Sequence, residues 1–227
     1  MRLLVINPNT TAAMTAAIGA AARDAATDPG LVTAVNPTTG PPSIQGPEDG
    51  AAALPGLYDV FERDVVSGDR YDAVIIACFD DTGLWELREH SPVPVVGIGE
   101  AGYHAGMLFG PKFSVVTTLA VSVPVLETNL ETYGFAARCS RVRASGVPVL
   151  ETDQGGDTEG RIRDEVAAAF AEDDVSSVVL GCAGMAGLAE RMTAHFGKPV
   201  IDGVAAAVRL CALLANARTG LSSRGVA

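Results

Sequence analysis

The sequence is poor in aromatic residues, in clustered positive charge and in long apolar runs, and each of these absences excludes a class of protein. Aromatic residues make up 5% of the 227 residues, which argues against an all-β sandwich. No segment is rich in lysine and arginine, and the formal net charge is −11, so neither nucleic acid nor an anionic membrane is expected as a partner. No apolar run approaches the roughly 18 residues that a membrane span needs.

The cysteines lack the spacing of a metal site or of a disulfide framework. None of them forms a C-x-x-C motif, and none lies near a histidine pair. The N-terminus, MRLLVINPNT, is too short and too polar for a signal peptide. We therefore expect free thiols in a cytoplasmic, reducing setting, with no metal held by the cysteines. The four cysteines are Cys78, Cys139, Cys182 and Cys211.

What the sequence has instead is a regular alternation of two kinds of segment. Apolar β-branched runs bounded by turn residues are typical of buried parallel strands, and alanine-rich stretches between them are typical of helices. This rhythm predicts an α/β fold with parallel sheet. The expected strands are Leu3–Ile6, Val32–Val35, Ala73–Ala77, Val95–Ile98, Ser114–Val116, Ser177–Leu180 and Val200–Ile201. The expected helices are Thr11–Thr27, Gly50–Ser67, Leu84–Glu89, Ala101–Leu108, Pro124–Thr132, Gly160–Glu172, Gly187–Phe196 and Val204–Asn216, with a frayed tail after Arg218.

Two distant segments repeat the same order of features. A strand ends at Cys78 and another ends at Cys182, and each cysteine is followed by a Gly-Leu pair, a helix and a short strand. This order predicts an internal duplication into two pseudo-symmetric, flavodoxin-like or Rossmann-like lobes with the active site between them. We expect an N-terminal lobe of residues 1–98 plus about 203–227 and a C-terminal lobe of residues 99–202.

The duplication indicates a chemistry for the two cysteines. Ligands of open α/β sheets bind beyond the carboxyl ends of the strands, so facing lobes would each present one thiol to a shared cleft. A helix N-terminus lowers the pKa of a thiol, and we expect this for Cys78 and Cys182. A thiolate on one face of a carbon acid and a thiol on the other would give racemisation without a cofactor. Cys139 and Cys211 have no such counterpart and are predicted to be structural.

Polar groups at other strand ends would hold the enolate oxygen that develops when the proton leaves. Asn9 and Thr10 follow the first strand, and Thr117 and Thr118 follow the strand in the middle of the chain.

A G-x-G-x-x-G motif at Gly97–Gly102 follows a strand and enters a helix. Dinucleotide binding also needs an acidic residue about 20 residues further on, at the end of the next strand. That region reads Thr117-Thr-Leu-Ala-Val-Ser and holds no acid. We therefore interpret the motif as a tight structural turn.

Five motifs together carry a family resemblance. They are NPNT at Asn7–Thr10, ACFDDTGL at Ala77–Leu84, FSVVTT at Phe113–Thr118, LGCAGM at Leu180–Met185 and VIDGV at Val200–Val204. In this order they resemble the hydantoin racemases of the Asp/Glu racemase superfamily, with allantoin racemase as a near relative, over almost the whole chain. The resemblance implies catalytic cysteines at Cys78 and Cys182, no metal, no pyridoxal phosphate, a small-molecule substrate and a homo-oligomer.

The resemblance also implies a set of substrate-binding positions. One departure lies in the loop GPPSIQG, where the family pattern leads us to expect glutamate in place of Gln45, so specificity is expected to differ. Ile44, Phe79 and Met185 are expected to form an apolar edge for the substituent of the ring. The full set of expected binding residues is Asn9, Thr10, Ser43, Ile44, Gln45, Phe79, Asp80, Thr117, Thr118, Ala183, Gly184 and Met185.

The predicted function is the interconversion of D- and L-5-monosubstituted hydantoins, or of allantoin by the same mechanism. An aspartate or glutamate racemase would want a cationic anchor, which the strand-end motifs lack. A decarboxylase would need only one cysteine, and a Cys–His hydrolase using His90 or His104 would leave Cys182 unexplained. A non-catalytic two-lobed binding protein would have no need of two thiols.

Overall fold

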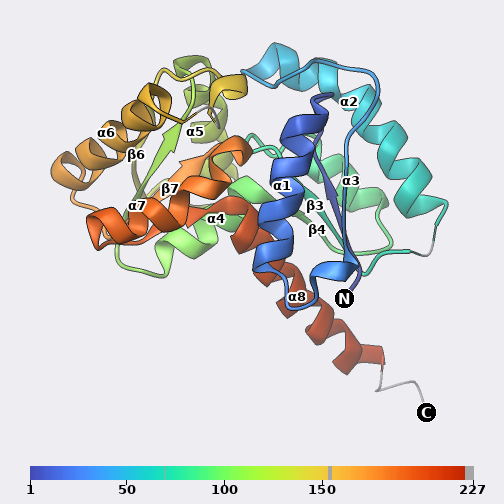
Figure 1. The fold of residues 1–227 in the computed structure, drawn as a ribbon. Helices are drawn as coiled ribbons and strands as arrows, with labels where there is room; N and C mark the ends of the chain where they lie inside the picture. The colour runs from blue at the N-terminus through green and yellow to red at the C-terminus, as the bar shows by residue number, and fades with distance from the viewer. Residues whose placement is uncertain (69, 153–154, 223–227) are drawn as a thin grey trace.

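Two four-stranded parallel sheets form the frame of the molecule (Figure 1). The computed structural model describes residues 1–68, 70–152 and 155–222. The first sheet has the order β2-β1-β3-β4 and the second has the order β6-β5-β7-β8, which confirms the predicted α/β class. The strands are β1 (Leu3–Ile6), β2 (Val32–Val35), β3 (Ala73–Ile76), β4 (Val95–Gly97), β5 (Phe113–Thr117), β6 (Cys139–Ala144), β7 (Ser177–Gly181) and β8 (Val200–Asp202).

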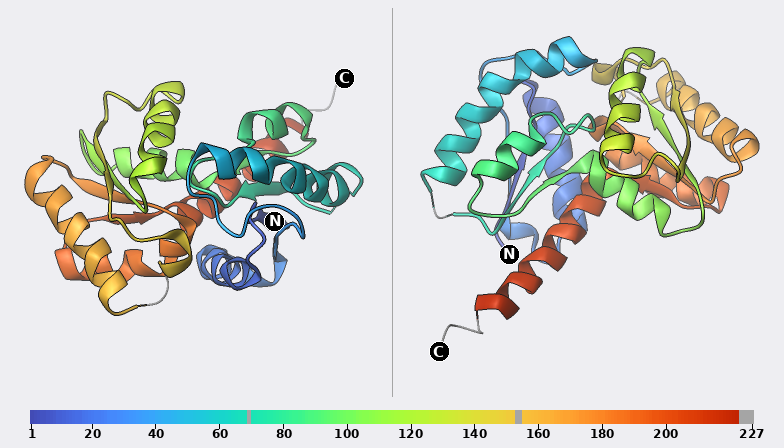
Figure 2. Two further views of the ribbon diagram at one scale, coloured as in Figure 1. Left: turned by 90° about the horizontal axis from the view of Figure 1, so that it is seen from above. Right: turned by 180° about the vertical axis from the view of Figure 1, so that it is seen from behind.

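Helices connect the strands and lie around both sheets, as the views from above and behind show (Figure 2). In the described ranges, no helix combines the length and apolar character that crossing a bilayer requires. The last helix continues to Ser222, beyond the predicted end at Asn216, and residues 223–227 of the predicted tail lie outside the described residues. The helices are α1 (Ala12–Ala25), α2 (Pro47–Phe61), α3 (Leu84–His90), α4 (Ile98–Met107), α5 (Val123–Thr132), α6 (Asp157–Glu172), α7 (Ala189–Phe196) and α8 (Gly203–Ser222), and single turns are η1 (Pro29–Leu31), η2 (Glu62–Val66), η3 (Ala120–Ser122), η4 (Val149–Glu151) and η5 (Ala183–Leu188).

The two sheets have the same topology. In the first sheet β1 lies between β2 and β3, and in the second sheet β5 lies between β6 and β7. Strands β3 and β7 therefore occupy equivalent places. This equivalence supports the proposed division into lobes of residues 1–98 and 99–202. Helix α8 packs against α1 and α4 and contacts strands of both sheets, so we keep its assignment to the first lobe as a proposal.

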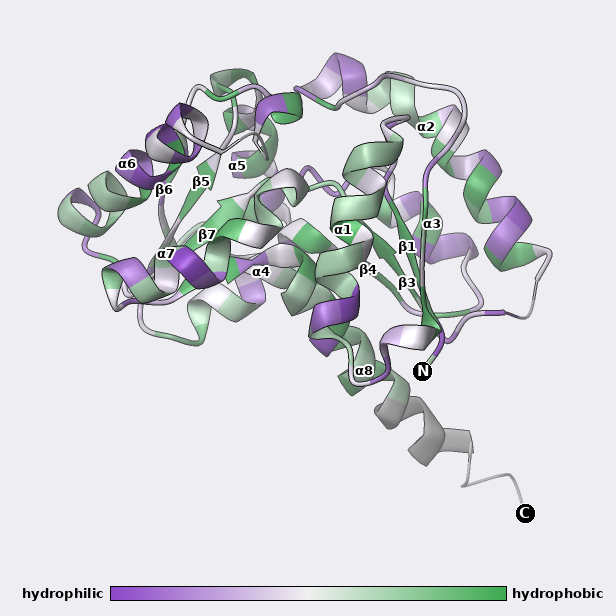
Figure 3. Ribbon diagram, in the orientation of Figure 1, coloured by the Kyte–Doolittle hydropathy of each residue, from purple (hydrophilic) through white to green (hydrophobic). Residues whose placement is uncertain are grey.

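The central strands are apolar on both faces because helices cover both faces of each sheet. Leu3–Ile6 of β1 and Ala73–Ile76 of β3 are fully buried, and β7 is buried along its whole length. In the hydropathy colouring these strands form green bands inside helices of mixed polarity (Figure 3). Burial on both faces fixes where each strand ends, and the polar residues that follow are thereby brought to one edge.

Strand β6 was not among the predicted strands. Its sequence, Cys-Ser-Arg-Val-Arg-Ala, carries two arginines and shows no apolar run. It lies at an edge of the second sheet, and Arg143 is nevertheless buried. The guanidinium of Arg143 binds the carboxylate of Asp173 at 2.6 Å and that of Glu165 at 3.0 Å. The strand is stabilised by ion pairs that sequence periodicity does not reveal.

Replacing Arg143 with leucine is expected to lower the free energy of unfolding by about 3 kcal/mol, because the buried Asp173 carboxylate would lose its charge partner. Burial acts to raise the pKa of Asp173, but hydrogen bonds from Arg143 and Ser114 outweigh it and hold that pKa below its usual value. A carboxyl whose pKa is lowered by folding stabilises the protein above its unfolded pKa, and this contribution is lost as the pH falls through the folded pKa. Urea unfolding at pH 7 and pH 3 should therefore show a difference between wild type and variant that shrinks in acid. An equal difference at both pH values would contradict this account.

Candidate active site

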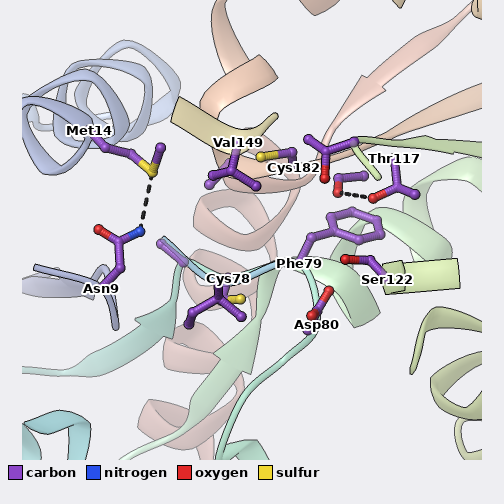
Figure 4. Close-up of a pocket in the computed structure, with 14 residues that line it drawn as sticks. Asn9, Met14, Cys78, Phe79, Asp80, Thr117, Ser122, Val149 and Cys182 are labelled. Atoms are coloured by element: carbon purple, nitrogen blue, oxygen red, sulfur yellow. Dashed lines mark hydrogen bonds between the residues drawn. The ribbon is translucent and has the colours of Figure 1, made fainter. Parts of the chain in front are cut away.

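A pocket lies where the carboxyl ends of both sheets meet. Its walls come from the residues that follow β1, β3, β5 and β7 together with two loops, and its volume is about 30 Å³, room for one or two waters. Figure 4 shows Cys78 and Cys182 on different sides of this pocket, with the ring of Phe79 to one side of them. The pocket is lined by Asn9, Met14, Ile44, Ala77, Cys78, Phe79, Asp80, Thr117, Thr118, Ser122, Val149, Gly181, Cys182 and Ala183.

Cys78 stands in the loop that leaves β3. The backbone N–H of Ala77 still bonds to the carbonyl of Ile6 at 2.8 Å, so the sheet ladder fixes the chain immediately before the thiol. The hydroxyl of Thr82 donates to the sulfur of Cys78 at 3.5 Å. Thr82 was not among the predicted site residues, although its place four residues after the cysteine could have suggested this contact.

Cys182 stands at the equivalent place after β7, where the short helical turn η5 begins. Its sulfur accepts hydrogen bonds from the backbone N–H groups of Gly184 and Met185. The amide of Gly184, predicted to hold the substrate ring, is thus directed at the thiol. Each half of the molecule therefore brings one thiol to the pocket, and the two are close enough to interact electrostatically.

The pKa values of both thiols are raised, and the expected lowering is wrong. Burial raises the pKa of Cys78, and the charge of Asp80 raises it further against the hydrogen bond from Thr82. Burial likewise raises the pKa of Cys182 to about 12, despite its two amide hydrogen bonds. Both cysteines are partly buried residues, and each lines the narrow pocket, where little water can solvate a thiolate. Desolvation therefore outweighs the helix N-terminus that the sequence suggested.

The loop that carries Cys78 is tied to helix α4 through Asp81. The carboxylate of Asp81 accepts hydrogen bonds from the N–H groups of Gly99 at 2.9 Å and Glu100 at 2.8 Å. A Cβ atom on Gly97 would stand 2.1 Å from this carboxylate, and one on Gly99 would stand 2.4 Å from the carbonyl of Phe79. The G-x-G-x-x-G motif is therefore structural, as predicted: the helix N-terminus that would bind a pyrophosphate is occupied by Asp81.

Polar groups from two strand ends, those of β1 and β5, line the pocket. The amide of Asn9 is oriented by accepting from the N–H of Thr11 at 2.9 Å, which leaves its nitrogen toward Met14 and the pocket. The hydroxyl of Thr117 donates to the carbonyl of Gly181 at 2.9 Å and joins the two central strands of the second sheet. The side chain of Thr118 lines the pocket without a hydrogen bond within the described part of the chain. Hydrogen-bond donors for a small polar ring are thus present.

The structure brings most of the predicted site residues to this pocket. Asn9, Ile44, Cys78, Phe79, Asp80, Thr117, Thr118, Cys182 and Ala183 line it.

Five predicted residues stand back from the lining. The hydroxyl of Thr10 donates to the carbonyl of Pro41, Ser43 is buried beside Ile44, and Met185 is fully buried in the core of the second lobe. Gln45 accepts from the N–H of Val149 at 3.2 Å, so the loop of the first lobe is bonded to the second. Gly184 supports the thiol of Cys182 instead of forming the wall.

Sequence reasoning missed part of the lining. Met14 lies one helical turn into α1, and Ser122 lies in the turn η3 before α5. Val149 follows the strand β6 that was itself not predicted, so no sequence signal could have placed it. The other missed lining residues, Ala77 and Gly181, each directly precede a predicted cysteine.

Neither histidine proposed for a hydrolase approaches Cys78. His90 is exposed and its Nδ1 bonds to the carbonyl of Glu86, whereas His104 lines a separate groove beside α8. Within the described residues, no group of three His, Cys, Asp or Glu side chains is arranged to hold a metal ion. Cys211 is fully buried in the core, and Cys139 lies partly buried at the start of β6.

The structure is an α/β fold with a pocket between two parallel sheets. The chain belongs to the Asp/Glu/hydantoin racemase family, whose model matches residues 3–211. It is 41% identical to the hydantoin racemase of Rhizobium meliloti, over 96% of this chain and 90% of that protein, and 39% identical to the hydantoin racemase of Pseudomonas sp. (strain NS671), over 92% and 84%. The solved allantoin racemase from Klebsiella pneumoniae is 39% identical and superposes with a TM-score of 0.90, over 98% of this chain and 89% of that one. The protein is accordingly an isomerase of the racemase type.

Because burial raises their pKa values, Cys78 and Cys182 should be alkylated slowly at pH 7. The rate of reaction with iodoacetamide, followed by mass spectrometry of the tryptic peptides, should keep rising up to pH 10 without reaching a plateau, since only the thiolate reacts. The same thiols in urea-unfolded protein should react with an ordinary pKa of about 8.5. A plateau below pH 8 in the folded protein would show that the helix N-terminus dominates after all.

Proposed function

We propose that this racemase interconverts the D and L forms of 5-monosubstituted hydantoins, a class that includes allantoin, without a cofactor. The observation that carries the proposal is the position of Cys78 and Cys182, which reach one pocket from equivalent strands of two sheets. The identities of 41% to a hydantoin racemase and 39% to an allantoin racemase support the substrate class. The narrow cavity must widen around the ring, which favours small substituents at C5.

In the proposed reaction, the thiolate of one cysteine removes the C5 proton and the C–H electron pair moves onto the C4 carbonyl oxygen. The thiol of the other cysteine then returns a proton to the opposite face as the carbonyl reforms, and the roles reverse for the other enantiomer. The side chains of Asn9 and Thr118 are placed to hold the enolate oxygen. A C5–H bond is a weak acid, so a thiolate whose pKa is raised by burial is a better-matched base than an ordinary one.

The residues that line the pocket also help to decide between this function and an amino-acid racemase. An amino-acid racemase must bind an α-carboxylate, and no Arg or Lys occurs among the described residues that line the pocket. The only charged side chain there is Asp80, which repels a carboxylate. A neutral ring is the substrate that this lining favours.

Cys78→Ser and Cys182→Ser are each expected to abolish racemisation, by about a thousandfold or more, because serine is too weak an acid to replace either thiol. An optically pure 5-substituted hydantoin is incubated in D2O, and optical rotation and deuterium at C5 are followed together. Each single variant should retain deuterium exchange with one enantiomer only.

Cys139→Ser, which changes a thiol outside the pocket, is the control and should racemise at the wild-type rate. Full racemisation by either pocket variant would contradict the paired-thiol mechanism. Ring opening or release of CO2 by wild type would replace the function with a hydrolase or a decarboxylase. Comparing the racemisation rates of allantoin and of 5-alkyl hydantoins in the same assay shows which C5 substituents the enzyme prefers.

We also propose that the protein is cytoplasmic and forms a homo-oligomer through α8. The four cysteines are unpaired, which suits a reducing compartment. Helix α8 projects from the body (Figure 1), and its Leu213 and Leu214 are 64% and 40% exposed. Leu108 and Phe109 line a groove of about 880 Å³ beside the same helix. On a chain with net charge −11, this apolar surface suits a second copy of α8 packed about a two-fold axis.

Leu213→Glu combined with Leu214→Glu is expected to convert the assembly into a monomer of 23.3 kDa, because burying two carboxylates in an apolar contact is costly. Light scattering coupled to size exclusion gives the mass. Leu31→Glu with Val66→Glu adds the same charge on exposed apolar residues elsewhere and should leave the mass unchanged. A wild type that is already monomeric would exclude this interface.

A further inference from the structure

Among the described residues that line the pocket, Asp80 is the one with a charged side chain. Its backbone is fixed, because the amide of Asn129 donates to its carbonyl at 2.8 Å and its own N–H bonds to the sulfur of Cys78. Within the described ranges the carboxylate itself makes no hydrogen bond and no ion pair, and burial alone determines its acidity. A rigid backbone thus presents an unsatisfied acceptor to the cavity.

The position of this carboxylate relates it to both thiols. Figure 4 places Asp80 on the side of the pocket where Cys78 lies, next to Ser122. Its negative charge acts on Cys78 and on Cys182, so it lies within electrostatic reach of both sulfurs. A molecule held between the thiols would therefore lie within electrostatic reach of Asp80.

The other polar side chains of the pocket include hydrogen-bond donors. The amide nitrogen of Asn9 and the hydroxyls of Thr118 and Ser122 can each donate to a carbonyl oxygen, and the two hydroxyls can also accept. Asp80 differs from them because its ionised carboxylate only accepts, and a charged acceptor is the strongest partner that the pocket offers to a ring N–H.

We propose that the carboxylate of Asp80 binds a ring N–H of the substrate and, by its uncompensated charge, excludes substrates that bear a carboxylate. This inference rests on the proposed function and extends it by naming the residue that distinguishes neutral cyclic ureides from amino acids. A site that hydrogen-bonds an N–H rejects the analogue lacking it more strongly than an apolar pocket does.

The proposal predicts a pH dependence. Burial raises the pKa of Asp80 to about 7, and the charged form is the stronger acceptor. The kcat/KM for a neutral hydantoin should fall as the pH drops through about 7, where the carboxylate becomes protonated. The titratable groups that face Asp80 are Cys78 on its own loop, Cys182 after β7 and Tyr103 on α4. The pKa of each is raised above its usual value, so none of them titrates near pH 7. Burial also raises the pKa of the adjacent Asp81 to about 7, so a variant of Asp80 is needed to separate the two carboxyl groups.

The test combines Asp80→Asn with deletion of the substrate N–H. A 5-substituted hydantoin and its N1-methyl and N3-methyl derivatives are assayed for racemisation by wild type and variant. With wild type, the kcat/KM of one methyl derivative should be at least tenfold lower than that of the parent hydantoin. Asp80→Asn should lower the kcat/KM of the parent hydantoin by about the same factor. With the variant, the kcat/KM values of the parent and of that methyl derivative should then agree within about twofold. The fall in kcat/KM near pH 7 should also be smaller in the variant, in which Asp81 is the neighbouring carboxyl group that still titrates there.

A second probe tests the excluded substrates. The inhibition constant of hydantoin-5-acetate should fall at least tenfold in Asp80→Asn, whereas that of the neutral hydantoin-5-acetamide should not fall. Glu89→Gln removes the same charge from an exposed position on α3 and should leave all these ratios unchanged. Asp80→Ser, smaller than the native residue, repeats the comparison in case the amide disturbs the loop.

The outcomes distinguish a failure of the proposed function from a failure of the proposed role of Asp80. If wild type does not racemise the parent hydantoin, the proposed function is wrong. If it does, but the methyl penalty is the same in wild type, Asp80→Asn and Asp80→Ser, then the penalty is steric and Asp80 does not bind the N–H. An unchanged constant for hydantoin-5-acetate in both variants would equally overturn the charge-exclusion part.

Discussion

The contact between Asp81 and the N-terminus of α4 determines where the first thiol stands. Asp81 adopts a φ of 52°, an uncommon conformation for a residue with a side chain, and its carboxylate binds the first free N–H groups of α4 and the hydroxyl of Tyr133. Helix α4 in turn packs on β7 through Gly102 and Val179. These contacts fix the position of Cys78 in the first lobe relative to β7, the strand that leads to Cys182 in the second. The fold therefore determines how the two thiols lie relative to each other.

In this arrangement burial destabilises the charged forms of the acidic groups, and this affects the chemistry of the pocket. Burial raises the pKa of Asp81 to about 7 even though three hydrogen bonds act to lower it. The neighbouring Asp80 lacks such bonds, and both thiols are buried beside it. The pocket thus gathers groups that lose solvation when charged, with no cation among its described lining residues. Such a pocket favours neutral substrates and proton transfers in which one thiolate and one thiol exchange roles, because the net charge of the pocket is then the same before and after the reaction.

Much of this could be predicted from the sequence because the signals are local. Strands buried on both faces read as apolar runs, and the repeated order of strand, cysteine and Gly-Leu located Cys78 and Cys182. The failures came from long-range effects. Strand β6 owes its burial to the pairing of Arg143 with Asp173, which are far apart in the chain, so Val149 was missed with it. The predicted lowering of the pKa values of Cys78 and Cys182 was wrong because a helix N-terminus can be recognised in the sequence, whereas the depth of burial cannot.

Two similar halves suit racemisation because they supply matched acid–base groups. The two enantiomers of a hydantoin have equal free energy, so the equilibrium constant is one whatever the catalyst. The pKa values of the two groups instead set how often each enantiomer meets a deprotonated base. Equivalent strands of equivalent sheets deliver two thiols whose pKa values burial raises in the same direction. A cysteine paired with a group of very different pKa would leave one base deprotonated far more often than the other at a given pH. Matched thiols therefore let such an enzyme accept either enantiomer with similar readiness.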